Sequence, residues 1–374
     1  MSMQNAKDLL KLLLQRSLEK VSGVSIVTRE LADNPRISPT RIIAIGKAAV
    51  SMYEGCQDRF SDVPGFVVTK VGHGAISSQN AEFLESAHPV PDNSSLYAGE
   101  RLVSWLSDAQ VDDRLLLLIS GGASSLVEKL RPGMSLNDLR AWTSAALADG
   151  SPIEAINAKR VELSEIKGGK LLSTFVGSDV DVLAISDVVS DGIDLIGSGL
   201  AHRGAFRGRY TSKVLTSNRS LRQELAQGAN FFGFKVRANE ENMSAPLEEV
   251  VQRLLAQTAQ GEPGIYIFGG EPTLTLPEAP GIGGRAQAMA LHLARSISGR
   301  REYTIMIAGS DGSDGVSEAA GAIVDGETFG RLPGGEEYIL RADSGTFFHK
   351  TGEALYTGPT GTNVADVAVV LKHA

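Results

Sequence analysis

The stretch from Phe268 to Ala294, FGGEPTLTLPEAPGIGGRAQAMALHLA, decides how this chain of 374 residues folds. It opens with the end of an apolar strand, Ile265–Phe268, and continues into a loop rich in proline and glycine. Arg285 then stands at the head of a segment whose apolar residues recur at helical spacing. Glu271 and Arg285 therefore border a loop between a strand and a helix, where α/β proteins bind their ligands.

Four glycines border the same loop: Gly269, Gly270, Gly283 and Gly284. Glycine lets backbone N–H groups approach an anion closely. Arg285 adds a forked donor that suits phosphate or carboxylate. We therefore predict that these residues, together with Glu271, contact an anionic ligand.

Three other apolar runs read as buried parallel strands that end in polar residues. They are residues 41–45 before Lys47, residues 115–119 before the turn at residues 120–125, and residues 180–185 before Asp187. A lysine in the first position could supply a point charge for a phosphate, although on this fact alone a solvated loop lysine is the better interpretation. An aspartate directly after a parallel strand is placed where catalytic carboxylates collect.

The turn after residues 115–119 contains Ser120, Gly121, Gly122 and Ser124. Small residues of this kind offer several backbone N–H groups to one point, which predicts an anion site. The alternative is a tight turn that only permits close packing. Lys167 ends a predicted helix over residues 153–166, and it either faces a nucleotide or belongs to a glycine-rich helix end.

A second glycine turn follows the apolar run at residues 303–308 and carries Asp311 and Asp314. Two carboxylates in such a turn suit Mg²⁺, which prefers a few carboxylates together with water and substrate phosphates. We predict Asp311, Asp314 and Glu271 as metal ligands. A turn of aspartate and glycine with no ligand is the alternative.

Strand after strand thus ends in a polar loop, with helices between, which predicts a doubly wound parallel α/β architecture twice over. The length favours two domains, and we place them at residues 1–242 and 243–374. The residues after Asp366 are predicted to form a final helix.

The net charge of −8 argues against a general nucleic-acid binder. A single cysteine, Cys56, excludes a disulfide within the chain and reads as a packed residue. The leucine-rich N-terminal segment is interrupted by charges at helical spacing, so we expect an amphipathic helix rather than a signal peptide or membrane span. These features predict a cytoplasmic protein without a membrane partner. Homo-oligomer formation stays open.

An ordered set of motifs resembles a known family over nearly the whole chain. The set comprises GKAA at 46–49, AHPVPD at 87–92, SGGAS at 120–124, EAINAKRVELSEIKGGKL at 154–171, SDV at 186–188, GGEPT at 269–273, GGRAQ at 283–287, GSDGSDG at 309–315, AAGAIVD at 319–325 and TGPTGTNVAD at 357–366. The chain resembles the glycerate 2-kinases of the DUF4147 family, whose C-terminal part is called the MOFRL domain.

The resemblance implies an ATP-dependent kinase that phosphorylates the 2-hydroxyl of D-glycerate with the help of Mg²⁺. It implies a larger Rossmann-like N-terminal domain and a smaller α/β MOFRL domain around a deep interdomain cleft. It also implies that Lys47 and Arg285 stabilise charge on the transferring phosphoryl group. Asp187, Glu271 and Asp311 would be the carboxylates of the cleft. From the chemistry of phosphoryl transfer itself, Asp187 is our candidate to accept or orient the proton of the acceptor hydroxyl.

The chain departs from the family pattern at Ala286 and Ala288, where an asparagine and a glutamate are usual, and at residues 150–153. A kinase for a related small sugar acid and a non-catalytic sugar-acid sensor are therefore alternatives. An NAD(P)-dependent hydroxypyruvate reductase is a third, because Gly281, Gly283 and Ala286 loosely match a dinucleotide-binding fingerprint. That match follows a proline-rich loop rather than a strand, which disfavours it.

Overall fold

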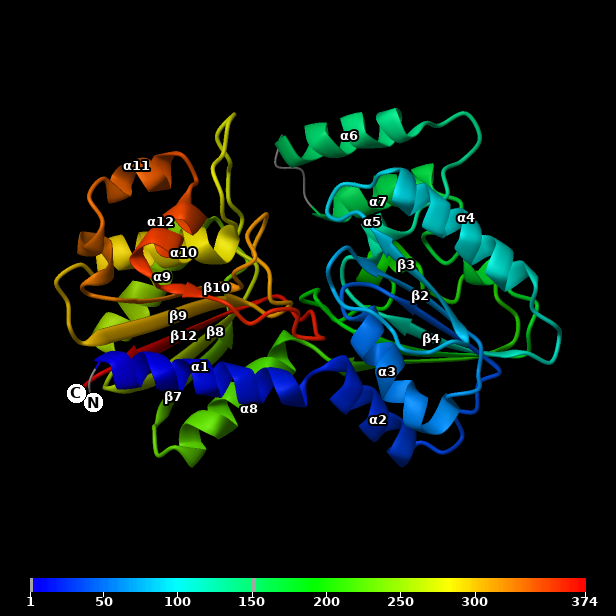
Figure 1. Cartoon of the computed structure of the whole chain (residues 1–374), viewed down its shortest axis with the longest axis horizontal. Helices are drawn as coiled ribbons and strands as arrows, with labels where there is room; N and C mark the ends of the chain where they lie inside the picture. Colours follow the sequence, from blue (N-terminus) through cyan, green and yellow to red (C-terminus); the bar gives the residue numbers. More distant parts are fainter. Residues whose placement is uncertain (1–2, 149–152) are drawn as a thin grey trace. The chain divides into compact units, whose positions relative to one another are not determined.

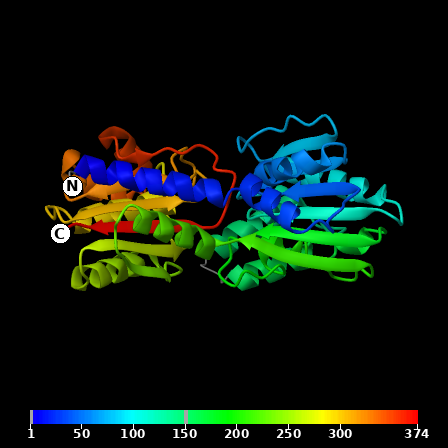
Figure 2. The same ribbon diagram turned by 90° about the horizontal axis from the view of Figure 1, so that it is seen from below.

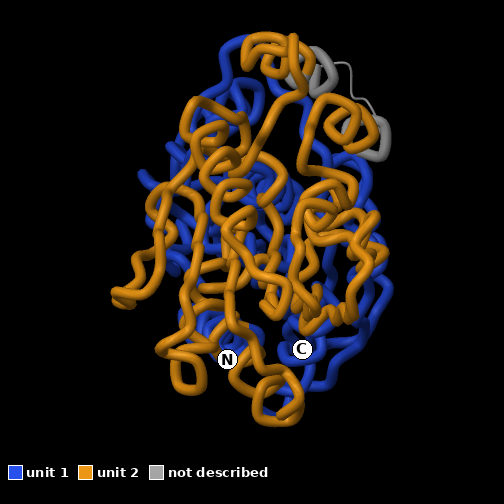
Figure 3. Tube along the Cα trace, turned by 90° about the vertical axis from the view of Figure 1, so that its right-hand side faces the viewer, with its two compact units in different colours: residues 1–21, 218–360, 364–374 blue, residues 22–217, 361–363 orange. Residues whose placement is uncertain are grey.

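The structure is a computed structural model that describes residues 3–148 and 153–374. The chain divides into two compact units (Figure 3), one of residues 22–217 and 361–363 and the other of residues 1–21, 218–360 and 364–374. We call them the central unit and the terminal unit. This division differs from the predicted boundary after residue 242, and it assigns the first helix to the terminal unit.

The central unit contains a six-stranded, wholly parallel sheet in the order β3-β2-β1-β4-β5-β6. Its strands are β1 (Arg41–Ile45), β2 (Gly65–Lys70), β3 (Ala81–Ser86), β4 (Arg114–Ile119), β5 (Asp179–Ile185) and β6 (Arg209–Thr216). The order is that of a dinucleotide-binding Rossmann sheet, in which the strand sequence reverses between β1 and β4. The Rossmann-like prediction for this part of the chain is confirmed.

Helices cover both faces of the parallel sheet (Figure 1), with α2 and α3 on one face and α4, α5 and α7 on the other. The helical segments of this unit are α2 (Gly23–Asp33), α3 (Ala49–Phe60), α4 (Asn93–Ser107), α5 (Ala123–Leu126), α6 (Leu136–Ala148), α7 (Ile153–Leu163), η1 (Leu172–Thr174) and η2 (Ile196–Gly199). Cys56 on α3 is buried, as predicted, and burial raises the pKa of its thiol to about 12.

The terminal unit has a mixed sheet in the order β11-β10-β9-β12-β8-β7. Its strands are β7 (Val236–Glu241), β8 (Gly264–Gly270), β9 (Tyr303–Gly309), β10 (Gly321–Asp325), β11 (Ala354–Leu355) and β12 (Asp366–Lys372). Among the neighbouring strands described in this sheet, β7 and β8 run parallel and all other pairs are antiparallel. The prediction of a second doubly wound parallel sheet is therefore wrong, because β12 enters between β8 and β9 in the opposite direction.

The predicted final helix is also wrong, since residues 366–372 form strand β12. This segment is a short apolar run, and periodicity alone does not separate a buried strand from a buried helix. Its three valines favour a strand. Residues 366–371 are buried on both faces of the sheet, which explains why the run lacks alternation.

Helices also cover both faces of the mixed sheet, with α1 and α8 lying together on one of them (Figure 2). The helical segments of this unit are α1 (Met3–Lys20), α8 (Asn218–Phe231), α9 (Leu247–Gln260), α10 (Arg285–Ser296), η3 (Thr328–Arg331), α11 (Gly335–Leu340) and α12 (Ser344–Thr351). Across the described residues, no helix is both long enough and apolar enough to cross a membrane.

Candidate active site

The reversal of strand order in the central unit places two of the predicted turns side by side. The turn after β1 contains Lys47, and the turn after β4 begins at Ser120. The Lys47 N–H donates to the Gly121 carbonyl at 3.0 Å, and the Ala48 N–H donates to the Ser120 Oγ at 3.1 Å. The crevice outside these strand ends is where doubly wound sheets bind ligands.

Ser120 has a different role from the predicted one. Its side chain is fully buried, and its hydroxyl joins the two turns rather than facing a ligand. Gly46 makes this close approach feasible, since it has a φ of +132° and a side chain there would overlap Ser120.

Asp187, at the end of β5, lies against the same turn. A side chain at Gly121 would overlap both the Asp187 carboxylate and the Asn363 amide, so only glycine fits there. The Asn363 Nδ2 donates to the Asp187 Oδ2 at 3.3 Å and orients the carboxylate. Asn363 was not among the predicted site residues, although it lies in the TGTN part of a recognised motif.

Ser124 and Gly122 are the half-exposed members of the turn. Arg160 on α7 approaches Ser124, with its Nη1 at 3.4 Å from the Ser124 Oγ. Burial lowers the pKa of Arg160, and the nearby Glu128 carboxylate opposes that change. Arg160 was not predicted either, and it supplies a guanidinium fork beside the turn.

Lys167 does not face a ligand, in contrast to one of the two predictions for it. Its side chain is fully buried and its amine is paired with the Glu128 carboxylate, which is also buried. Burial lowers the pKa of Lys167, while Glu128 opposes that effect. The adjacent Gly168 has a φ of +65°, consistent with a helix-end turn.

The terminal unit gathers its charged residues at one sheet edge because β12 is antiparallel to its neighbours. Asp366 starts β12 and is paired in register with both Gly270, the last residue of β8, and Gly309, the last of β9. Arg285 pairs with Glu271 at 2.8 Å and lies 3.6 Å from the Asp366 Oδ2. Asp366 was missed by the prediction, which considered only strand ends.

The charges of these residues change one another's pKa values. Burial raises the pKa of Asp366, and the carboxylates of Glu271, Asp314 and Asp311 raise it further, while Arg285 opposes them. Burial alone would lower the pKa of Arg285, but Asp366 and Glu271 outweigh it and raise that pKa. The cluster therefore holds more negative than positive charge, and a cation would relieve it.

Asp314 performs a structural task at the start of α10. Its two oxygens accept the N–H groups of Ala286 at 3.0 Å and Gln287 at 2.7 Å. Its pKa is raised to about 6 by burial, against the lowering effect of these hydrogen bonds. A carboxylate bonded at both oxygens is a helix cap, a role that the sequence prediction of a metal ligand did not include.

The four glycines of the predicted anion site separate into two pairs. Gly269 and Gly270 are buried inside β8, where the Gly269 carbonyl accepts the Met243 N–H at 2.9 Å, so packing explains them better than ligand contact. Gly283 and Gly284 are half-exposed before α10, and a side chain on Gly284 would overlap Asp314. Only the second pair is accessible in the way the prediction requires.

The predicted metal ligands do not form a ready cage. Among residues 3–148 and 153–374, no group of three or more His, Cys, Asp or Glu side chains is arranged to hold a metal ion. Asp311 makes a local turn, accepting the Ser313 N–H at 2.9 Å. Mg²⁺ often needs only one or two protein carboxylates because phosphates and water complete its shell. Magnesium binding by Glu271 and Asp311 remains a proposal.

Comparison with known proteins agrees with this arrangement. Residues 9–226 match the family described as a domain of unknown function, DUF4147, and residues 264–366 match the MOFRL family. The chain is 32% identical to a D-glycerate 2-kinase of Thermotoga maritima over 96% of each protein. It is 31% identical to an Agrobacterium vitis protein named only provisionally as a hydroxypyruvate reductase, over 88% of this chain and 98% of that protein.

A crystal structure of glycerate kinase from Thermotoga maritima is similar throughout, with a TM-score of 0.81 and 29% identity over 99% of this chain and 100% of that one. The family models together span both units, and the relatives extend over almost the full length. The chain therefore belongs to the DUF4147 family with a MOFRL region, the family of glycerate 2-kinases.

Proposed function

We propose that this protein is an ATP-dependent kinase that phosphorylates the 2-hydroxyl of D-glycerate and gives 2-phosphoglycerate. Family membership supports the reaction class. The observation that carries the proposal to this chain is the hydrogen-bonded pair of turns containing Lys47 and Ser120–Ser124, at the strand reversal of a Rossmann sheet. Sites of this kind bind phosphorylated ligands in α/β proteins.

Phosphoryl transfer needs little covalent help from a protein, because its transition state is loose and highly charged. Catalysis then depends on positioning the reactants and neutralising charge. We assign charge neutralisation to Lys47 and Arg285. The carboxylates around Arg285 keep it protonated, since they raise its pKa despite burial.

Asp187 is our candidate to orient the acceptor hydroxyl and to accept its proton. It follows a buried parallel strand, and Asn363 holds one of its two carboxylate oxygens at 3.3 Å. A hydrogen bond to one oxygen fixes the plane of the group and directs the other oxygen. The backbone of Gly121 lies directly against it, which keeps larger side chains away from the carboxylate.

Arg160 and Ser124 are our candidates for the acceptor's carboxylate. The guanidinium and the hydroxyl lie 3.4 Å apart, and both residues are half-exposed. A carboxylate suits a forked donor in a partly buried place, where charge-assisted hydrogen bonds are stronger than in water. This assignment leaves the backbone N–H groups of Gly122 and Gly283–Gly284 for phosphate oxygens.

A Mg²⁺ ion would fit the acidic edge of the terminal unit, because the carboxylates there exceed the single guanidinium and are hard oxygen donors. Glu271 and Asp311 would hold it. When bound, the ion neutralises charge on the phosphates of ATP. Asp314 is excluded from our ligand set because α10 uses both of its oxygens.

The decisive experiment incubates the full chain with ATP, Mg²⁺ and D-glycerate and identifies the product by ³¹P NMR. Phosphate on the 2-oxygen is the expected result. ADP release only with another sugar acid would keep the kinase and change its acceptor. No ADP release with any of a panel of hydroxy acids would contradict the proposal and favour a sugar-acid sensor.

The same preparation tests the reductase alternative by adding hydroxypyruvate and NADH or NADPH and following absorbance at the nicotinamide band. We expect no oxidation. The loose fingerprint at Gly281–Ala286 does not follow a strand directly, and the backbone at Gly283 and Gly284 packs against Ser344 and Asp314. The first strand-to-helix turn of the Rossmann sheet, residues 45–49, also lacks the glycine pattern.

A further inference from the structure

Asn218, at the start of α8, is buried in the terminal unit and contacts the segment that leads into β12. Its Nδ2 donates to the Val364 carbonyl at 2.9 Å and to the Asp366 carbonyl at 3.0 Å. Burial shields these hydrogen bonds from water and strengthens them. Asn218 therefore bonds both ends of a three-residue turn, residues 364–366, which we call the β12 turn.

The orientation of the Asn218 amide follows from Arg222, which lies one helical turn later in α8. The Arg222 Nε donates to the Asn218 Oδ1 at 2.9 Å, and a guanidinium can only donate. The amide oxygen therefore faces Arg222, and both N–H groups of the amide are left for the two carbonyls. Arg222 is itself fixed by Glu241 on β7, whose Oε2 accepts from the Arg222 Nη2 at 2.9 Å.

The middle residue of the β12 turn has an unfavourable backbone conformation. Ala365 has a φ of +64°, in the left-handed region that residues with a Cβ seldom adopt. Such a conformation persists where the surrounding contacts over-determine it. The two hydrogen bonds from Asn218 flank Ala365, and the Val364 N–H donates to the Ser310 Oγ at 2.7 Å. These bonds hold the turn in its strained form.

The close approach of Asn218 also explains a glycine of the GGEPT motif. A side chain at Gly269, on β8, would overlap the Asn218 Oδ1. Residue 269 must therefore be a glycine if the amide is to reach the β12 turn.

The β12 turn determines where Asp366 lies, and the Asp366 carboxylate lies beside Arg285. The Asp366 Oδ2 is 3.6 Å from the Arg285 Nε, and Arg285 also pairs with Glu271 at 2.8 Å. Arg285 is the guanidinium to which we assign charge neutralisation in phosphoryl transfer. A shift of the Asp366 backbone would displace one of the two carboxylates that orient it, and a misplacement of about 1 Å can cost about 10²-fold in rate.

We propose that Asn218 is a positioning residue for the kinase reaction. It holds Ala365 in the left-handed conformation and thereby keeps Asp366, and with it Arg285, in place. This role rests on the proposed function, because Arg285 can affect a rate only if the chain transfers a phosphoryl group. Asn218 itself is buried and acts through the backbone of the β12 turn.

Steady-state kinetics of the full chain with ATP and D-glycerate test this role through Asn218→Ala. We expect kcat to fall by about tenfold or more and both KM values to change by less than about threefold, since Arg285 acts on the transition state. Asn218→Asp is a second variant of the same shape. It keeps an acceptor for Arg222 but has no donor for the two carbonyls, so its kcat should fall as well.

Rescue by glycine separates positioning from a general loss of structure. Glycine adopts a positive φ as readily as a negative one, so Ala365→Gly lets the β12 turn keep its conformation without Asn218. The double variant Asn218→Ala/Ala365→Gly should therefore recover most of the lost kcat. The matched control is Asn218→Ala/Ala342→Gly, which should recover none, because Ala342 also has a positive φ of +48° but lies between α11 and α12.

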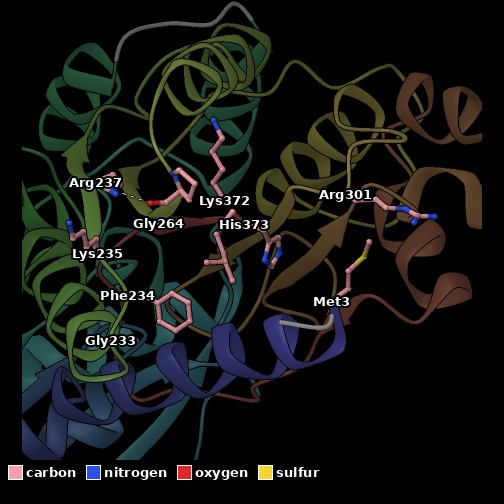
Figure 4. Close-up of a pocket in the computed structure, with 12 residues that line it drawn as sticks. Met3, Gly233, Phe234, Lys235, Arg237, Gly264, Arg301, Lys372 and His373 are labelled. Carbon is pink, nitrogen blue, oxygen red and sulfur yellow. Dashed lines mark hydrogen bonds between the residues drawn. The ribbon is translucent and has the colours of Figure 1, made fainter.

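A further control tests whether the loss of any side-chain bond to a carbonyl has the same effect. Arg237 on β7 donates to the Pro263 carbonyl at 2.9 Å (Figure 4). It lines an open pocket of about 550 Å³ at the Gly264 end of β8, whereas Asp366 is paired with Gly270 at the other end. Arg237→Ala should leave kcat unchanged.

Hydrogen exchange followed by mass spectrometry, without substrates, distinguishes this role from the proposed function. The peptide that contains residues 364–367 should exchange faster in Asn218→Ala than in the wild type, and as slowly as in the wild type in Arg237→Ala. A wild type that shows this pattern but transfers no phosphate would contradict the kinase proposal and support the contact of Asn218 with the turn. Unchanged exchange in Asn218→Ala would overturn the role of Asn218. So would wild-type kcat in both Asn218 variants, or equal rescue by Ala342→Gly.

Discussion

At the scale of single residues, Lys47 is the most direct test of the proposed chemistry. Its backbone is fixed by the Gly121 carbonyl, and it lies at the start of α3 beside the turn that follows β4. Because its charge acts mainly on the transition state, Lys47→Ala should lower kcat by about 10²–10³-fold. Steady-state kinetics with Lys11→Ala as a control check this, and near wild-type turnover would remove Lys47 from the mechanism.

Arg160 tests which substrate the turn at Ser120–Ser124 receives. If its guanidinium binds the acceptor's carboxylate, Arg160→Ala should raise the KM for D-glycerate by about 10–100-fold and leave the KM for ATP nearly unchanged. Lys159→Ala is the matched control, because Lys159 is next in sequence but pairs with Glu162. A rise in the KM for ATP instead would place nucleotide phosphates at Arg160.

Arg285 has a structural role that sequence alone did not show, because Asp366 is buried behind it. Burial raises the pKa of Asp366 to about 8, and Arg285 opposes that rise, so Arg285→Ala should raise this pKa further. Below about pH 7 the folded wild type and the folded variant both have a protonated Asp366, and this group should cause little difference in their free energies of unfolding. As the pH rises past 8, Asp366 ionises in the wild type but is held protonated in the variant, so the variant should become less stable than the wild type by about 1–3 kcal/mol toward pH 9.5.

Urea unfolding of the wild type and Arg285→Ala at pH 6.5, 8 and 9.5 measures this, and Arg285→Ala/Asp366→Asn is the control. The double variant has no titrating group at residue 366 and should recover most of the lost stability at pH 9.5. A loss that does not change with pH, or a double variant as unstable as the single one, would show that Asp366 is not the cause.

At the scale of elements, Asp314 shows how one carboxylate can be assigned to a helix or to a metal. As the cap of α10 it accepts two backbone N–H groups, so Asp314→Ala should lower the free energy of unfolding by about 1–2 kcal/mol.

Asp311→Asn should be nearly neutral for stability but should raise the Mg²⁺ concentration needed for half-maximal activity. If Asp314→Asn shows the larger change in Mg²⁺ requirement, Asp314 is a ligand after all.

The sequence could predict which polar residues of the central unit follow strand ends, because one physical rule governs their placement. Buried apolar runs form parallel strands, parallel strands end at one edge, and Lys47, Ser120–Ser124 and Asp187 follow such ends. This rule does not predict which way a side chain points, and the Ser120 and Lys167 side chains are in fact buried. Their hydroxyl and amine satisfy partners that are close in space but distant in sequence.

The same rule fails in the terminal unit, where the direction of a strand decides which residues meet. Asp366 joins Glu271 and Arg285 because β12 begins, rather than ends, at their edge of the sheet. The run at residues 366–372 is too short and too uniformly apolar to reveal its structure or direction. A prediction based on which residues follow strands therefore could not find Asn363, Asp366 or Arg160.

At the scale of the whole molecule, the sequence family and the compact units divide the chain differently. The DUF4147 match covers residues 9–226, yet α1 and α8 within it pack in the terminal unit, on the sheet that also contains the MOFRL region. The terminal unit is thus built from both ends of the chain, and the central unit is inserted between its parts. This organisation makes the N-terminal helix a structural component of a sheet formed more than 200 residues later in the chain.

Leu13 on α1 tests this dependence. It is buried, and the position of Gly228 on α8 leaves room for its side chain. Leu13→Ala should lower the stability of the terminal unit by about 2–5 kcal/mol, because a buried leucine leaves both lost burial and a cavity. Hydrogen exchange followed by mass spectrometry should show faster exchange in β9 and α8, with β1 and β4 protected as before. The control is Leu102→Ala on α4, buried in the central unit, which should give the reverse pattern. If hydrogen exchange in Leu13→Ala became equally faster in both units, the chain would unfold as one cooperative body. The assignment of α1 to the terminal unit would then not correspond to a separately unfolding part of the chain.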